Sequence, residues 1–167
     1  NDRCLNVMPL FQIHGLIAAV LSSFHVGSSV LCTPGFDALK FFGWMQETAP
    51  TWYTAVPTMH QVILGRAGRN REALDEVKLR FVRSSSASLP PQVMSELEKT
   101  FQAPVIEAYG MTEAAHQMTS NQLPPGKRKV LKAGFAAGPE VAILENNNVI
   151  FKNDKIGEII IKGDNVT

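Results

Sequence analysis

The sequence has almost no excess of charge of either sign and very little cysteine. Its 167 residues include 16 Lys and Arg against 15 Asp and Glu, and charged residues make up only 19% of the chain. Binding to nucleic acid or to an anionic membrane surface needs a cationic patch, so we expect no nucleic-acid partner. Cys4 and Cys32 are too few and too far apart for a disulfide scaffold. Two thiols suit a reducing compartment, and we expect an intracellular location, cytoplasmic or peroxisomal.

A long hydrophobic run is also missing. The most apolar stretch, residues 16–32, is interrupted by serines, a histidine and a glycine, whereas a membrane-spanning helix needs about 20 predominantly apolar residues. We therefore expect no membrane span. The first residue is Asn1 and no signal-peptide pattern follows it, so we expect a piece of a longer protein. With 45% hydrophobic residues the chain can nevertheless bury a core.

The first two-thirds of the sequence alternates short strand-like runs with segments of helical length. The expected strands are residues 4–8, 29–32, 52–56, 79–83 and 104–109, and the expected helices are residues 15–24, 37–48 and the segments that begin at Pro57 and Pro91. Such alternation predicts βαβ crossovers. We expect an α/β fold over residues 1–125, doubly wound, with a mainly parallel sheet and helices on both faces.

Two of these helices have particular local signals. Residues 15–24 are apolar enough for a buried helix, closed by Gly27 at its carboxyl end. Asp37 is the expected N-cap of the next helix, and Leu39 is the first residue of the apolar face predicted there.

The pattern changes after Leu123. Residues 122–132 form a basic loop with proline and glycine, which we expect to be solvated. Strand-like runs follow at residues 141–144, 149–152 and 159–162, with an asparagine turn after the first. This pattern predicts an antiparallel β meander, and residues 135–167 would begin a second, β-barrel-like subdomain.

Polar side chains follow several of the predicted strands. Ligands of open α/β sheets bind beyond the carboxyl ends of the strands, so these side chains would gather at one edge. The most distinctive segment is YGMTE, residues 109–113, which combines an aromatic ring, a hydroxyl group and a carboxylate suited to Mg²⁺. On spacing alone, Thr112 could equally cap a helix whose dipole Glu113 complements. His25 and His60 are expected to be structural.

YGMTE resembles the Y-G-x-T-E signature of adenylate-forming enzymes, the superfamily of acyl-CoA synthetases, luciferases and peptide-synthetase adenylation domains. Three more stretches resemble family motifs in order and spacing: PLFQIHG (9–15), SSSASLPP (84–91) and GEIIIKG (157–163). The sequence around them is most similar to oxalyl-CoA synthetase-like members. The resemblance covers nearly the whole chain.

The resemblance implies roles for individual residues. The residues implied to bind the nucleotide are Ser86, Ala87, Ser88, Glu107, Ala108, Tyr109, Gly110 and Thr112. Of these, the serines and Ala87 would line one side of the adenine slot and Tyr109 the other, with Glu107 and Ala108 near the exocyclic amine. Thr112 would hold the α-phosphate, and Glu113 would bind Mg²⁺; these two residues would serve catalysis.

The same resemblance places the acid substrate beside the nucleotide. His14 and Met111 would border the acyl pocket. The second carboxylate of a small dicarboxylic acid would need polar or cationic partners, and His14, Ser86 and His116 are the candidates. His116 lies three residues after Glu113, so on a helical turn both side chains would face the same way.

The implied function of the parent protein is ATP-dependent ligation of a carboxylic acid to coenzyme A through an acyl-adenylate, with Mg²⁺. The acid would be a small dicarboxylic acid such as oxalate. The family's phosphate loop, its ribose-binding Asp and its C-terminal catalytic Lys have no counterpart in these 167 residues, so we expect the isolated chain to be inactive. Two alternatives are a fatty-acid or aromatic-acid CoA ligase, and a noncatalytic module that binds a nucleotide or another protein.

Overall fold

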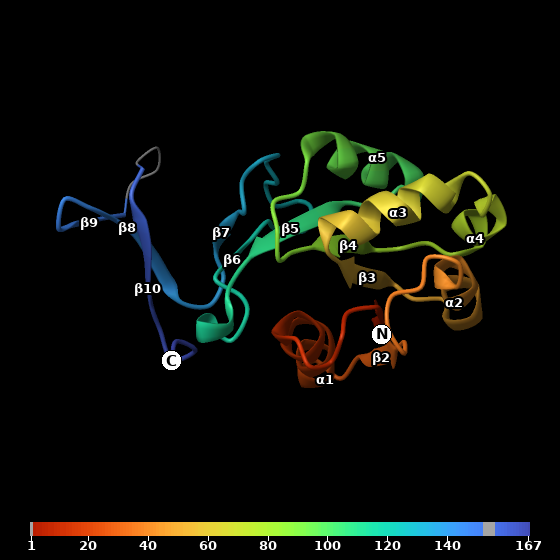
Figure 1. The fold of residues 1–167 in the computed structure, drawn as a ribbon, viewed down its shortest axis with the longest axis horizontal. Coiled ribbons are helices and arrows are strands. Elements are labelled where there is room, and N and C mark those ends of the chain that lie inside the picture. The colour runs from red at the N-terminus through yellow and green to blue at the C-terminus, as the bar shows by residue number, and fades with distance from the viewer. Residues whose placement is uncertain (1, 152–155) are drawn as a thin grey trace.

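The computed structural model describes residues 2–151 and 156–167. Its main feature is a seven-stranded sheet in the order β2-β1-β3-β4-β5-β6-β7 (Figure 1). The strands are β1 (Arg3–Asn6), β2 (Ser29–Cys32), β3 (Trp52–Ala55), β4 (Phe81–Ser84), β5 (Val105–Tyr109), β6 (Thr119–Ser120) and β7 (Phe135–Ala136). The first five run parallel, and β6 and β7 are antiparallel additions. The predicted mainly parallel sheet is confirmed.

Helices cover both faces of this sheet, also as predicted. The helices of one face are α2 (Phe41–Thr48), α3 (Pro57–Ala67), α4 (Arg71–Glu76) and α5 (Pro91–Phe101), and the other face is covered by η1 (His14–Leu21) and α1 (Ser22–His25) (Figure 1). Pro57 and Pro91 begin α3 and α5, because a proline at the first helical position gives up no hydrogen bond. The main core lies under α2 to α5, and a smaller one of Cys4, Ala19 and Trp52 lies under η1.

The segment expected to be one buried helix differs from the prediction. Residues 14–21 form a π-helix that continues into α1, and Leu16, Leu21 and Phe24 are exposed. The composition shows that this segment is hydrophobic, but it does not show which of its side chains face the sheet. The end of the helix is as predicted: Gly27 has a φ of +69° and its N–H donates to the carbonyl of Phe24 at 3.0 Å.

The predicted start of the next helix is wrong by three residues. The Asp37 carboxylate accepts the N–H groups of Leu39 and Lys40 at 2.8 and 3.2 Å, so it caps a turn, and α2 itself begins at Phe41. Leu39 lies in that turn and is 72% exposed, so it is no part of the buried face.

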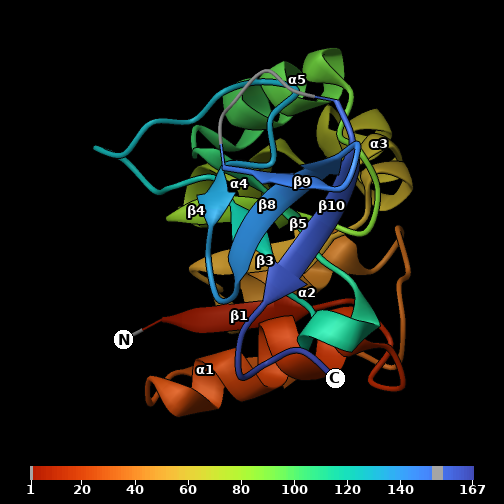
Figure 2. The ribbon, with the colours of Figure 1, turned by 90° about the vertical axis from the view of Figure 1, so that its left-hand side faces the viewer.

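The C-terminal residues form a separate three-stranded antiparallel sheet, which stands to one side of the large sheet (Figures 1 and 2). Its strands are β8 (Glu140–Glu145), β9 (Asn148–Ile150) and β10 (Glu158–Lys162), and β8 lies in the centre. A meander would place β9 in the centre, so that prediction is wrong, although the two-residue turn at Asn146 and Asn147 is present with both φ angles positive. Lys152, predicted to end the second strand, lies outside the described residues.

Two further expectations concern the surface. Arg128, expected in a solvated loop, is half-buried and donates to the Glu98 carboxylate and to the carbonyl of Val105, so it ties the loop to α5 and β5. None of the helices in residues 2–151 and 156–167 has the length and apolarity needed to cross a membrane.

Candidate functional site

The loops after β4 and β5 enclose a slot of about 320 Å³. Its lining includes all the residues predicted to bind the nucleotide except Thr112: Ser86, Ala87, Ser88, Glu107, Ala108, Tyr109 and Gly110. Parallel pairing of β4 with β5 brings these loops together, since Ser84 lies opposite Glu107 in the register. The Ser85 hydroxyl also donates to the carbonyl of Ala108 at 2.8 Å and holds the first loop against β5.

Glu107 has one carboxylate oxygen without a partner. Oε1 accepts the N–H of Leu89 at 2.9 Å, whereas Oε2 is buried and has no hydrogen bond. A buried acceptor left unpaired is costly, and a ligand that donates a hydrogen bond would remove that cost. Because Tyr109 and Glu107 line the same slot, a planar base with an exocyclic amine fits both groups.

Ser86 holds an unusual backbone conformation at the rim of the slot. Its φ of 74° lies in the left-handed region, which is rare for a residue with a side chain, and such strain concentrates at functional sites. Its Oγ lies 3.0 Å from Nδ1 of His14, which comes from the first turn of η1. Both residues line a neighbouring cavity of about 580 Å³ together with Thr112. The structure thus brings His14, Ser86 and Thr112 to one place.

Glu113 and Met111 occupy the exposed side of the same loop. Neither lines the two cavities described above, and the carbonyl of Glu113 accepts the N–H of Thr167 at 2.9 Å. Within the described part of the chain there is no group of three or more His, Cys, Asp or Glu side chains that could hold a metal ion. Mg²⁺ commonly binds one carboxylate together with phosphate and water oxygens, and the exposed carboxylate of Glu113 next to Thr112 suits that arrangement.

His116 does not face the same way as Glu113, so this prediction is wrong. The helical turn η2 (Thr112–Ala114) ends at once, because Ala115 and His116 both have positive φ angles and reverse the chain. His116 is therefore buried, at 4% exposure, while Glu113 is exposed. The reversal packs the His116 carbonyl against Gly110, where a Cβ atom would lie only 1.3 Å from that oxygen.

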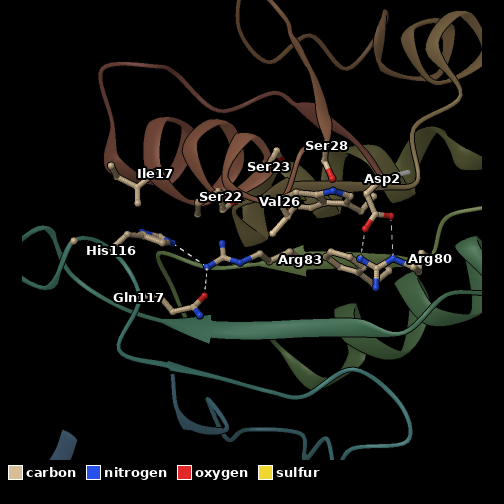
Figure 3. Close-up of a pocket in the computed structure, with 14 residues that line it drawn as sticks. Asp2, Ile17, Ser22, Ser23, Val26, Ser28, Arg80, Arg83, His116 and Gln117 are labelled. Atoms are coloured by element: carbon tan, nitrogen blue, oxygen red, sulfur yellow. Dashed lines mark hydrogen bonds and ion pairs between the residues drawn. The ribbon is translucent and has the colours of Figure 1, made fainter. Parts of the chain in front are cut away.

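Arg83, which sequence reasoning left without a role, lies beside the two predicted histidines. Its Nη2 is 2.9 Å from Nε2 of His116 (Figure 3). Its Nη1 is 3.2 Å from Nε2 of His14. The two imidazole rings stack with their centroids 5.2 Å apart. Thr54 Oγ1 and Gln117 Oε1 complete the surroundings of the guanidinium at 3.4 and 3.3 Å.

This arrangement constrains the protonation of the histidines. A guanidinium can only donate hydrogen bonds, so Nε2 of His116 accepts and its proton lies on Nδ1. Nε2 of His14 also lies 2.6 Å from the Thr54 hydroxyl, a group that both donates and accepts. Burial, followed by the positive charge of Arg83, lowers the pKa of His14 to about 3 and that of His116 to about 4. Both are neutral at pH 7. Burial also lowers the pKa of Arg83 to about 10, which leaves it cationic.

The signal for Arg83 was present in the sequence. Arg83 was placed in a strand of a sheet with helices on both faces, where a charged side chain must be buried and needs a reason. Leu131 and Ala133, which also line the nucleotide slot, were missed for another reason. They come from the loop between β6 and β7, and no local pattern places that loop against β5.

The comparisons with known proteins identify the family of this chain. The AMP-binding enzyme family matches residues 1–167, and the chain belongs to that family. It is 46% identical to an oxalate–CoA ligase of Arabidopsis thaliana and 44% identical to one of Saccharomyces cerevisiae, over 100% and 99% of its length. It spans only 33% and 30% of those relatives.

Solved structures give the same result for the fold. O-succinylbenzoate coenzyme A synthetase from Bacillus subtilis, in complex with ATP and a magnesium ion, superimposes with a TM-score of 0.81 at 28% identity. The match covers 99% of this chain and 33% of that one.

Proposed function

We propose that this chain is the part of an acid–CoA ligase that binds the adenine, the α-phosphate and the acyl group. The observation that carries the proposal is the slot between the loops after β4 and β5, which is lined by Glu107, a residue whose buried Oε2 has no hydrogen bond. Ser86, Ala87 and Ser88 would contact one face of the base and Tyr109 the other. Ala108 and Gly110 are the small residues that let the base approach the backbone.

The proposed reaction begins with attack of a carboxylate oxygen on the α-phosphorus of ATP. The bond to the bridging oxygen breaks, pyrophosphate leaves and an acyl-adenylate remains; coenzyme A then displaces AMP and forms the thioester. Thr112 would bond an α-phosphate oxygen, and Glu113 would hold the Mg²⁺ that neutralises phosphate charge. The contribution of these residues is positioning and electrostatic stabilisation.

A small dicarboxylic acid is the proposed substrate. The region next to the nucleotide slot holds His14, His116 and the charged Arg83, and a long alkyl chain would have to strip these polar groups of water without replacing their hydrogen bonds. The Arabidopsis and yeast relatives are named oxalate–CoA ligases, which supports the same acid class. Met111 would border the acyl group at the exposed side.

Acid-dependent exchange of labelled pyrophosphate into ATP tests the proposal on the complete protein that contains this chain. Glu113→Gln is expected to lower the exchange rate by roughly 100-fold, with partial recovery at high Mg²⁺ concentration, because a carboxylate ligand is lost. Thermal stability should not change, since Glu113 is exposed. Glu72→Gln, at an exposed position on α4, is the control and should retain full activity.

Two results would contradict the proposal. Absence of exchange with every acid tested would exclude the ligase function, and an unchanged rate for Glu113→Gln would exclude the metal-binding role. The 167-residue chain alone is expected to give no exchange, because it spans about a third of the relatives it matches.

A further inference from the structure

Arg83 is a buried cation without a carboxylate partner. Its residue is 6% exposed, and no Asp or Glu of the described residues forms an ion pair with it. Its four neighbours are neutral acceptors: Thr54 Oγ1, Gln117 Oε1 and the Nε2 atoms of His14 and His116. A buried charge normally has an opposite charge beside it, because neutral groups compensate its lost hydration only in part.

The guanidinium borders a cavity of about 320 Å³ that lies between η1 and the sheet. Figure 3 shows Arg83 reaching along the sheet towards His116 and Gln117, with Ile17 of the helix on the opposite side. At the other end of the cavity Arg80 and Asp2 form two hydrogen bonds of 2.5 and 3.0 Å and neutralise each other. Among the described residues that line this cavity, Arg83 is therefore the cation left unpaired.

His14 and His116 flank the guanidinium. Because Nε2 of His116 accepts from Arg83, its proton lies on Nδ1, on the far side of the ring from the guanidinium. His14 lies between Arg83 and Ser86, with its Nδ1 3.0 Å from Ser86 Oγ. Only the width of the His14 ring separates Ser86 from Arg83.

We infer that Arg83 binds the non-reacting carboxylate of a short dicarboxylic acid, and thereby selects diacids against monocarboxylic acids. The inference rests on the proposed ligase function, in which the other carboxylate reaches the α-phosphate beside Ser86 and Thr112. The His14 ring lies between Ser86 and Arg83, so the two carboxylates of the acid would be about one imidazole ring apart. This spacing limits the acid to a few carbons. Arg83 is the specificity-determining residue in this scheme.

The test measures kcat/KM in the pyrophosphate-exchange assay for two matched pairs of acids, oxalate against acetate and malonate against propionate. In Arg83→Gln the value for both diacids should fall by at least about 100-fold, because a charge-assisted contact is lost. The values for the monoacids and the KM for ATP should stay within about threefold. Arg83→Lys should retain part of the diacid preference, because it keeps the charge but not the planar fork.

Arg80→Gln is the matched control. It removes an arginine at the other end of the same cavity, one that Asp2 already pairs, and should leave diacid activity within about threefold of wild type.

A second variant keeps the guanidinium and supplies the missing carboxylate. Gln117→Glu would place an anion about where Oε1 now lies, 3.3 Å from Nη2 of Arg83. The internal ion pair should lower diacid kcat/KM by a similar factor while the protein stays folded, as thermal unfolding would show. This variant keeps the inference testable if Arg83→Gln does not fold.

The outcomes distinguish a failure of the role of Arg83 from a failure of the ligase function. Wild type that exchanges pyrophosphate with monoacids but not with diacids would overturn the role of Arg83 and leave the ligase function standing. Equal losses for diacids and monoacids in Arg83→Gln and in Gln117→Glu would also overturn it, because they would indicate a purely structural arginine. No exchange with any acid would overturn the ligase function itself.

Discussion

At the scale of single residues, the charge state of the site depends on one arginine. The chain as a whole has a net charge of only +1, yet Arg83 places a cation under η1. Burial, together with that charge, lowers the pKa of the two histidines beside it and keeps them neutral. The sequence identified His14, Ser86 and His116 as polar candidates. It could not show that both histidines contact the same guanidinium, because that depends on contacts across 69 and 33 residues.

Because His116 is neutral, the effect of replacing it on kcat/KM should not depend on pH near neutrality. Burial, then the charge of Arg83, lowers the pKa of His116 to about 4, so the free enzyme does not protonate it between pH 6 and 8. His116→Asn should lower kcat/KM for oxalate by roughly 10- to 100-fold, because the acceptor that holds the Arg83 guanidinium is displaced. The ratio of variant to wild type should be constant between pH 6 and 8, since kcat/KM reports the free enzyme.

A different pH dependence would contradict this assignment. If an imidazolium bound the acid, the advantage of wild type over His116→Asn would shrink about tenfold for each pH unit above the pKa. Measuring both proteins in the same buffers removes the contribution of other ionising groups.

At the scale of elements, strands and helices in the first two-thirds were largely predictable, and the connections were not. Strong periodic patterns and prolines located β1 to β5, α3 and α5 correctly. The errors fall where a neighbour decides the conformation: the exposed face of η1, the turn before α2, and the reversal at Ala115 and His116. Each depends on contacts that a local pattern does not contain.

The prediction at this scale concerns the loop between β5 and β6, where the His116 carbonyl approaches Gly110. A Cβ at Gly110 would lie 1.3 Å from the His116 carbonyl oxygen, which is backbone and cannot rotate away. Gly110→Ala should therefore destabilise the protein by more than about 2 kcal/mol and abolish pyrophosphate exchange. Urea denaturation and the exchange assay measure the two effects.

Gly65 is the matched control, because a Cβ there would meet nothing within 4 Å and the residue lies inside α3. Gly65→Ala should be stabilising by about 0.5–1 kcal/mol, since alanine favours a helix over glycine. Equal effects of the two substitutions would show that the close approach at Gly110 is unimportant.

At the scale of the whole molecule, both faces of the sheet bury histidine. His60 lies on the buried face of α3 with its Nδ1 3.1 Å from the Tyr53 hydroxyl, and burial lowers its pKa to about 4. With His14 and His116 on the other face, three histidines have a lower pKa in the folded state than in the unfolded chain. The sequence predicted a structural role for His60, and it lies in the core as expected.

These histidines make the fold sensitive to acid. Below pH 6.5 the unfolded chain takes up protons that the folded state does not bind until about pH 4 or lower, so the free energy of unfolding falls as pH falls through this window. Each histidine contributes at most about 1.4 kcal/mol per pH unit. Urea denaturation between pH 7 and 5 should show a smaller slope for His60→Gln than for wild type.

Tyr53→Phe is the control for that slope. It removes the hydrogen bond to His60 without removing a group that titrates in the window, because burial raises the pKa of Tyr53 well above its usual value. Its slope against pH should remain close to that of wild type. A slope for His60→Gln equal to that of wild type would contradict the assignment of a lowered pKa to His60.

The sequence alone determined the class of sheet, the two loops after β4 and β5 that line the slot, and the position of YGMTE at the end of β5. These features follow from local periodicity and from the rule that parallel strands end at one edge, and both are properties of neighbouring residues. Only the tertiary structure decided that Arg83 is buried without a carboxylate, between histidines from η1 and from the loop after β5. The cost of burying a charge depends on what surrounds it in space, and strand order and helix packing set those surroundings.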